Sequence, residues 1–392
     1  MLDRFFLLGS RSIPWLDGVR GLAIILVVIR HTFDRPYHQL VGEKILANDA
    51  LWLKLLAGFG WCGVTLFFIL SGFLVGGTIV LEVHSGTFRW REFALKRFIR
   101  VYIPAMIFLT LMATASHREI LSTISLHNYL LMANYTRDIW LSHYWSLAVE
   151  EHFYILLPIS GILLTQILRQ HSLVSLSRGI LIIALSFSLL RLIAAQTNLV
   201  IDPDDYYRLS HWQFDYFALG IALRLFHEHQ KTMGISKTIT PSFAANILTI
   251  CTFFSIMIVF SWFASNVEGN NVLNQTANGG ASGILYLLNI IMFGAMFFAM
   301  MMGAMVNLFA LRWLRIVAAI SFSTYIVHVL VLENTPFLYQ PLSKINDPTI
   351  ELLFALAIGL GTSLAAGLLF FVLVERPALL LRNRLLQWAK VS

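Results

Sequence analysis

Long runs of apolar residues separated by short polar segments dominate this chain. A membrane-spanning helix needs about 20 mostly apolar residues, and this ruler predicts about ten spans. They lie near residues 15–34, 57–82, 98–115, 145–168, 178–196, 211–227, 241–264, 282–306, 313–333 and 351–374. None shows the alternation of a membrane β-strand, and residues 290–306 are apolar on every side. The pattern predicts an all-α fold, a polytopic transmembrane helical bundle.

Composition supports this prediction. Hydrophobic residues make up 58% of the 392 residues and charged residues 12%, against roughly 25% charged residues in soluble domains. No polar segment is long enough for a separate soluble domain, so residues 1–392 are expected to form one transmembrane domain. Cys62 and Cys251 lie in apolar runs without the spacing of metal ligands, which indicates neither a zinc site nor a disulfide framework.

The net charge of +7 reflects membrane topology rather than a nucleic-acid partner. Nucleic-acid binding needs basic residues gathered on one solvated face, whereas here they are scattered between apolar runs. Most lysines and arginines fall into the inner segments if the N-terminus is cytoplasmic. We therefore expect both termini on the cytoplasmic side.

The first predicted span contains ionisable residues, which are costly inside a bilayer and so indicate function. Arg20 and His31 are eleven residues apart. At about 100° and 1.5 Å per residue they fall within about 20° of one face and about 16 Å apart along the helix. The alternative is that both side chains only extend to the two interfaces.

The fourth span opens with polar residues where a helix should enter lipid. Ser146 and Glu150 are four residues apart and share a face. A carboxylate at this depth needs a partner, and His31 arrives from the same outer side. A Glu150-oriented imidazole accepts a proton from a hydroxyl. Glu151, in contrast, is expected to be interfacial and solvated.

Two further polar groups lie at helical spacing. Arg97 and Arg100 are three residues apart on the predicted inner side, and paired guanidinium groups favour phosphate ligands. The alternative is that the two arginines reflect the ordinary positive-inside bias or contact anionic lipid. Ser321, Tyr325 and His328 form one polar stripe, which must face the bundle interior. Hydrogen bonding between helices alone would also explain the stripe.

Ser71 follows a run of apolar residues and precedes a glycine, with no base adjacent in the sequence. We interpret it as a small packing residue rather than a nucleophile.

Taken in order, these residues resemble acyltransferase family 3, the integral-membrane O-acyltransferases of bacterial glycans and natural products, over essentially the whole chain. The resemblance is carried by the LDGxRGLA context of Arg20 with His31, the GVxLFFxLSGFL run at 63–74, the Arg97 and Arg100 pair, WSLxxE at 145–150, the stripe at 321–328 and Glu-x-Pro at 375–377.

Three positions depart from the family pattern. Pro104 comes one residue late after the arginine pair, and Phe322 replaces a usual tyrosine. Gln213 stands two residues before Asp215, where family members often have an arginine, and Arg208 is only a speculative substitute.

The resemblance implies transfer of an acyl group, commonly acetyl, from cytoplasmic acyl-CoA to a hydroxyl of a glycan, glycolipid or glycoside acceptor. The enzyme would lie in a bacterial inner membrane, with acyl-CoA as donor substrate, no permanently bound cofactor and no metal. Its catalytic residues would be His31 as general base with Glu150 and Arg20. The donor would be held by Arg97, Arg100 and Arg20, and the substrate path would be lined by Ser146, Tyr325, His328 and Asp215.

A different class of function fits the same residues. Buried Arg, His and Glu side chains also line solute paths, so a polytopic transporter or flippase for a polar or glycolipid solute is the alternative. The sequence shows no inverted repeat to support it.

Overall fold

The computed structural model describes residues 5–6, 13–33, 60, 62–115, 123–136, 141, 143–197, 207–234, 246–247, 252, 255 and 279–391. Within these ranges every regular element is a helix, which confirms the predicted all-α class. The predicted span at 241–264 and the segment around 35–56 lie almost wholly outside the described residues, as does Cys251.

The described elements are α-helices, π-helical turns and short 3₁₀ turns. In chain order they are α2 (Pro14–Thr32), α5 (Cys62–Ser71), η2 (Gly72–Gly76), α6 (Gly77–Ser85), α7 (Trp90–Arg97), η3 (Phe98–Tyr102), α8 (Ile103–Ala115), α9 (Thr123–Tyr129), α10 (Ala133–Thr136), α11 (Tyr144–Leu163), α12 (Thr165–Gln170), α13 (Leu173–Gln196), η4 (Ser210–Trp212), α15 (Phe214–Thr232), α17 (Gly279–Met301), α18 (Val306–Phe309), α19 (Arg312–Ala319), α20 (Ser321–Asn334), η7 (Pro336–Leu338), η8 (Gln340–Lys344), α21 (Pro348–Phe370), η9 (Phe371–Glu375) and α22 (Arg376–Val391).

Five described helical stretches are long and apolar enough to cross a membrane, as expected of a multi-pass protein. They are Cys62–Ser85, Trp90–Ala115, Tyr144–Leu163, Leu173–Gln196 and Thr349–Gln387, and the pair α19 and α20, bent by 69°, would add a sixth. Helices α2 and α15 coincide with two other predicted spans but carry several charged residues, so composition alone does not count them. The total of about ten spans and the side of the termini stay predictions.

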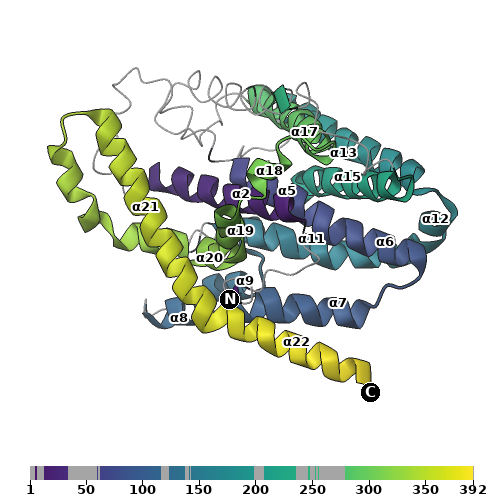
Figure 1. Ribbon diagram of the computed structural model, residues 1–392, viewed down its shortest axis with the longest axis horizontal. Helices are drawn as coiled ribbons and strands as arrows, with labels where there is room; N and C mark the ends of the chain where they lie inside the picture. The colour runs from purple at the N-terminus through teal and green to yellow at the C-terminus, as the bar shows by residue number, and fades with distance from the viewer. Residues whose placement is uncertain are drawn as a thin grey trace.

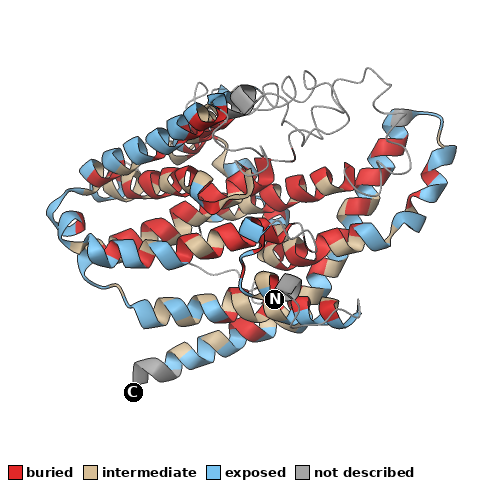
Figure 2. Ribbon diagram, turned by 180° about the vertical axis from the view of Figure 1, so that it is seen from behind, coloured by how far each residue is buried: buried red, intermediate tan, exposed pale blue. Residues whose placement is uncertain are grey.

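Helix α2 runs through the middle of the bundle, in contact with α5, α18, α19, α20 and α21 (Figure 1). Helices α13, α15 and α17 pack together on one side, while α22 lies beside α7 and η3 at the opposite edge. Most residues of α2 are buried, whereas the outer helices expose one face (Figure 2). The exposed face of α13 is apolar, with Ile182 64% exposed, as expected where lipid replaces water.

Two glycines bring the backbones of α15 and the α5–η2 segment together. A Cβ atom on Gly220 would lie 2.1 Å from the carbonyl oxygen of Ile69, and one on Gly72 would lie 2.2 Å from that of Phe217. Only residues without a side chain allow this approach, the usual means of close packing between membrane helices. The crossing fixes the position of Ser71 and of the π-helical turn η2 that follows it.

This crossing predicts a contrast between two glycine substitutions. Gly220→Ala should lower stability by about 1–3 kcal/mol or more because the methyl group overpacks a backbone contact. Gly179→Ala, in α13, meets nothing within 4 Å and should be neutral or stabilise the helix by up to about 1 kcal/mol. Thermal unfolding of the two purified variants in detergent measures the difference, and equal melting temperatures would contradict the packing described.

Candidate active site

A cavity of about 100 Å³ lies inside the bundle, between α2, α5, α11, α20 and the α7–η3 segment. Six of the residues predicted from sequence line it together: Arg20, Arg97, Arg100, Ser146, Glu150 and Tyr325. Ser71, Tyr154 and Ser321 add polar groups, and side chains such as Phe67 and Phe68 form apolar walls. Side chains far apart in the sequence thus meet at one cavity, and Asp215, His31 and His328 are not among its lining residues.

Three π-helical turns bear polar residues of this region. Turn η2 begins directly after Ser71, η3 contains Arg100, and η9 ends at Glu375. A π-turn shifts the residues after it out of the ordinary helical register and is frequent at functional sites. Glu375 accepts a hydrogen bond of 2.5 Å from the Ser323 hydroxyl of α20 and attracts Arg100 electrostatically. Arg100 and Glu375, which attract one another, thus both lie in breaks of the regular α-helical pattern.

Glu150 is bound by hydroxyl groups rather than by the histidine. The Ser71 hydroxyl donates a hydrogen bond to Glu150 Oε1, and the Tyr154 hydroxyl donates to the same oxygen at 3.4 Å. The guanidinium carbon of Arg97 lies 3.9 Å from the ring centroid of Tyr154, a cation–π contact. The interpretation of Ser71 as mere packing therefore missed a direct partner of the cavity carboxylate, because Glu150 is 79 residues away in the sequence.

The structure shows other neighbours for Glu150 and His31. Glu150 accepts hydrogen bonds from Ser71 and Tyr154, whereas His31 lies beside His328 and is not among the lining residues of this cavity. Glu151, expected to be solvated, is only 2% exposed, and it lies close enough to Arg97 to be attracted by its charge. The two glutamates thus have the reverse of the expected exposure, since Glu150 is the more accessible of the two.

One turn of α11 away from Glu150, about 6 Å along the axis, Ser146 shares a hydrogen bond with the hydroxyl of Tyr325. The same tyrosine hydroxyl donates to the backbone oxygen of His143 at 2.7 Å. These contacts join α11 to α20 at the end of the cavity furthest from Arg97 and Arg100 along α11. They place His328, three residues after Tyr325, just beyond the cavity.

His328 is the close neighbour of His31. Their ring centroids are 4.8 Å apart, and His328 Nε2 lies 3.4 Å from His31 Nδ1. His328 Nδ1 is 2.7 Å from the Tyr325 carbonyl oxygen, which can only accept, so the proton of His328 belongs on Nδ1 and its Nε2 is an acceptor. His31 Nδ1 lies 2.9 Å from the carbonyl oxygen of Val27 and is by the same argument a donor. The lone pair of neutral His31 is then on Nε2, the atom a general base uses.

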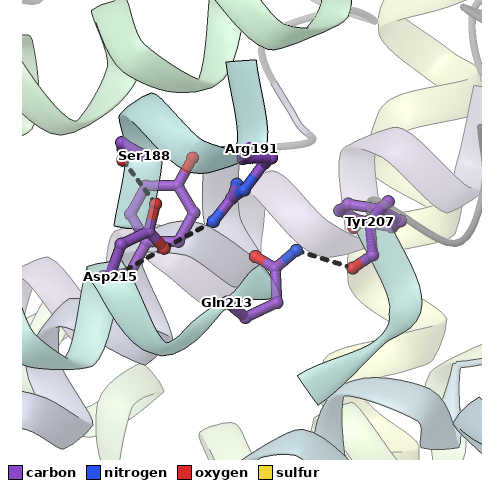
Figure 3. Close-up of polar contacts among 6 residues, drawn as sticks. Ser188, Arg191, Tyr207, Gln213 and Asp215 are labelled. Atoms are coloured by element: carbon purple, nitrogen blue, oxygen red, sulfur yellow. Dashed lines mark hydrogen bonds and ion pairs between the residues drawn. The ribbon is translucent and has the colours of Figure 1, made fainter. Parts of the chain in front are cut away.

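Asp215 has a different environment from the other predicted lining residues (Figure 3). It forms a salt bridge of 2.6 Å with Arg191 of α13, and both side chains are fully buried. Ser188 donates to its second oxygen at 2.5 Å, and the Arg191 guanidinium carbon lies 4.4 Å from the ring centroid of Tyr286 in α17. The pair therefore links α13, α15 and α17.

Gln213 and Arg208 do not supply the arginine that the resemblance suggested. The Gln213 amide donates to the backbone oxygen of Tyr207 at 2.8 Å, and the backbone oxygen of Arg208 accepts from Asn134. Arg191 is the charge that meets Asp215. The sequence contained the signal for it, because an arginine inside the predicted span 178–196 requires a buried partner.

Comparison with known proteins decides the family. The model of the acyltransferase domain of acyltransferase family 3 matches residues 13–371, nearly the whole chain. The chain belongs to acyltransferase family 3. It is therefore a membrane acyltransferase, which favours an enzyme over the transporter or flippase considered above. Helix α22 lies beyond the matched acyltransferase domain.

Individual relatives of this acyltransferase are distant. It is 27% identical to an uncharacterized protein of Haemophilus influenzae over 50% of this chain and 84% of that protein. It is 27% identical to a "putative O-acetyltransferase" and 28% identical to the O-acetyltransferase OatA, both of Staphylococcus aureus, in each case over 38% of this chain. The matched regions cover only 24% and 25% of the staphylococcal proteins. No solved structure matches the acyltransferase.

The salt bridge at Asp215 predicts a stability effect. Asp215→Ala should destabilise the protein by about 3–5 kcal/mol because it leaves Arg191 charged and buried without its partner. Replacing both residues, Arg191→Met with Asp215→Leu, should restore most of that loss. Thermal unfolding and the yield of monodisperse protein measure both variants. A catalytic role for Asp215 would instead leave Asp215→Ala as stable as the wild type but inactive.

Proposed function

We propose that the enzyme is an O-acyltransferase that moves an acetyl group from acyl-CoA, on the cytoplasmic side of a bacterial inner membrane, to a hydroxyl of a glycan, glycolipid or glycoside acceptor. The observation that carries this proposal is the row of polar groups through the bundle. It begins at Arg97 and Arg100, passes Glu150 and the Ser146–Tyr325 contact, and leads to the His31–His328 pair.

The arginine end suits the donor. Arg20, Arg97 and Arg100 bring three positive charges to one small cavity, where Glu150 is the only acidic lining residue. Excess positive charge in a half-buried cavity favours an anionic ligand, and arginine suits phosphate because its guanidinium group donates two parallel hydrogen bonds. Acyl-CoA has phosphate groups at one end and the thioester at the other, so a donor anchored at the arginines extends toward Ser146 and Tyr325.

The histidine end suits the acceptor. His31 Nε2 removes the proton of the acceptor hydroxyl while that oxygen attacks the thioester carbonyl carbon. The carbon–sulfur bond then breaks, the acetyl ester forms, and the CoA thiolate takes up the proton. The Nδ1–H of His31 is shared between the Val27 carbonyl oxygen, at 2.9 Å, and His328 Nε2, at 3.4 Å, and both acceptors keep the His31 ring in the basic tautomer. Such a base supplies roughly 10²- to 10⁴-fold in rate.

Glu150 takes a different part in this proposal from the one its sequence position suggested. Its carboxylate, fixed by Ser71 and Tyr154, lies between the arginines and the Ser146–Tyr325 contact. There it balances part of the arginine charge when the donor is absent and limits how far the phosphate groups enter. Arg20 also lines the cavity, and in this proposal it favours the negative charge that develops on the carbonyl oxygen of the thioester.

Removal of the base tests the proposal. His31→Ala should lower acetyl transfer by roughly 10²- to 10⁴-fold while acetyl-CoA binding is retained, because the arginines are untouched. Transfer from radiolabelled acetyl-CoA to membrane glycans, measured with the full chain in lipid nanodiscs, reports the rate. The control His171→Ala changes an exposed histidine at the end of α12 and should keep wild-type activity. Near-normal transfer by folded His31→Ala would refute the role of His31.

The Ser71–Glu150 contact gives a second test. Ser71→Ala removes a hydrogen bond to a carboxylate, worth about 1.5–3 kcal/mol, and should lower kcat/KM about 10-fold or more. Glu150→Gln keeps a hydrogen-bond acceptor but removes the charge, and should affect the KM for acetyl-CoA more than Ser71→Ala does. Ser85→Ala, an exposed serine at the end of α6, is the matched control. Unchanged kinetics in both cavity variants would show that this carboxylate is only structural.

A further inference from the structure

A second cavity, of about 490 Å³, opens beside the first. Its walls come from η2, α6, α7, η3 and α22. Val75, Arg97 and Arg100 line both cavities, so the two spaces meet at these residues. We call the second cavity the basic vestibule.

The vestibule has an excess of positive charge. Its basic lining residues are Arg89, Lys96, Arg97, Arg100 and Arg382, and its acidic ones are Glu82 and Glu92. Glu92 is already engaged, at 2.7 Å from Lys96 and 3.9 Å from Arg89. Within the described part of the chain, no carboxylate lies within salt-bridge distance of Arg97, Arg100 or Arg382. Three guanidinium groups therefore face one space without a paired anion.

Arg382 is the member of this group that sequence analysis did not single out. It lies on α22, which packs against α7 and η3 (Figure 1). Its hydrogen bonds go to the side-chain oxygen of the adjacent Asn383, at 3.3 and 3.0 Å, and leave the rest of the guanidinium group available. Arg382 lies beyond the region that the family model matches, residues 13–371.

The volumes of the two cavities indicate which part of the donor each one accommodates. Binding sites for small molecules commonly have volumes of about 300–1,000 Å³, a range that includes the vestibule but not the cavity of about 100 Å³. The smaller cavity accommodates the thin acyl end of a donor. A nucleotide with phosphate groups needs the larger, positively charged space next to it.

We propose that the basic vestibule binds the phosphate-bearing nucleotide of acyl-CoA and that Arg382 contacts one of its phosphate groups. This inference rests on the proposed function and assigns a part of the donor to residues outside the catalytic cavity. Arg97 and Arg100, at the junction, then contact the diphosphate that joins the nucleoside to the pantetheine arm. Arg382 holds the donor in position and takes no part in the chemical step.

The test compares donors that lack parts of the nucleotide. Arg382→Gln in the full chain, in nanodiscs, should raise the KM for acetyl-CoA about 10-fold with kcat unchanged, as loss of one charge-assisted phosphate contact predicts. The KM for acetyl-pantetheine, which has no nucleotide, should not change. Arg382→Lys should restore part of the affinity for acetyl-CoA. Comparison of acetyl-CoA with its 3′-dephospho form identifies the phosphate involved.

Arg384→Gln is the matched control. It removes the same charge two residues away on α22, from an exposed position that does not line the vestibule, and should leave every KM unchanged. The inference is overturned if Arg382→Gln keeps the wild-type KM for acetyl-CoA, or if it raises the KM for acetyl-pantetheine to the same extent. Failure of the wild type to use acetyl-CoA at all would instead overturn the proposed function, and with it this inference.

Discussion

Positive charge inside an apolar bundle is the constraint on which this structure depends. A central arginine costs about 2.5–3.5 kcal/mol on insertion scales, and Arg20, Arg97 and Arg100 meet at one cavity. Such a group persists only where other elements hold it. Here the holding groups are Glu375 with Ser323, the ring of Tyr154, and the carboxylate of Glu150 fixed by Ser71. The π-turns beside Ser71, at Arg100 and at Glu375 give these residues directions that an unbroken helix would not.

The surroundings of the charged residues inside the bundle differ. Arg191 and Asp215 are paired at 2.6 Å and fully buried, which makes them a link between helices. Arg20, Arg97, Arg100 and Arg382 line the two cavities and have no salt bridge to a carboxylate among the described residues, which makes them candidate binding groups. An arginine side chain thus stabilises the packing of α13, α15 and α17, whereas the arginine side chains at the cavities are available to an anionic ligand.

The sequence alone predicted the helices and most of the polar residues that line the cavity, because both depend on patterns within one segment. The runs at 57–82, 145–168 and 178–196 agree with helices of the structure to within a few residues, and an ionisable residue inside such a run must face the interior. Errors arose where two segments meet. Such features depend on how helices far apart in the chain are rotated and shifted relative to one another. They include the burial of Glu151, the position of Glu150 relative to His31, and the contacts of Ser71 with Glu150 and of Arg191 with Asp215. The hydrophobic periodicity of a single segment does not contain information about these rotations and shifts.

The central claim is that one polar path joins the arginines to the histidine pair. A cryo-electron microscopy map of the full chain in nanodiscs, with a non-hydrolysable acetyl-CoA analogue, tests it most directly. The account predicts density for the nucleotide between Arg97 and Arg382, with the acetyl end pointing past Ser146 toward His31. Density for the analogue on a lipid-facing surface, or with its acyl end directed away from the two histidines, would contradict it.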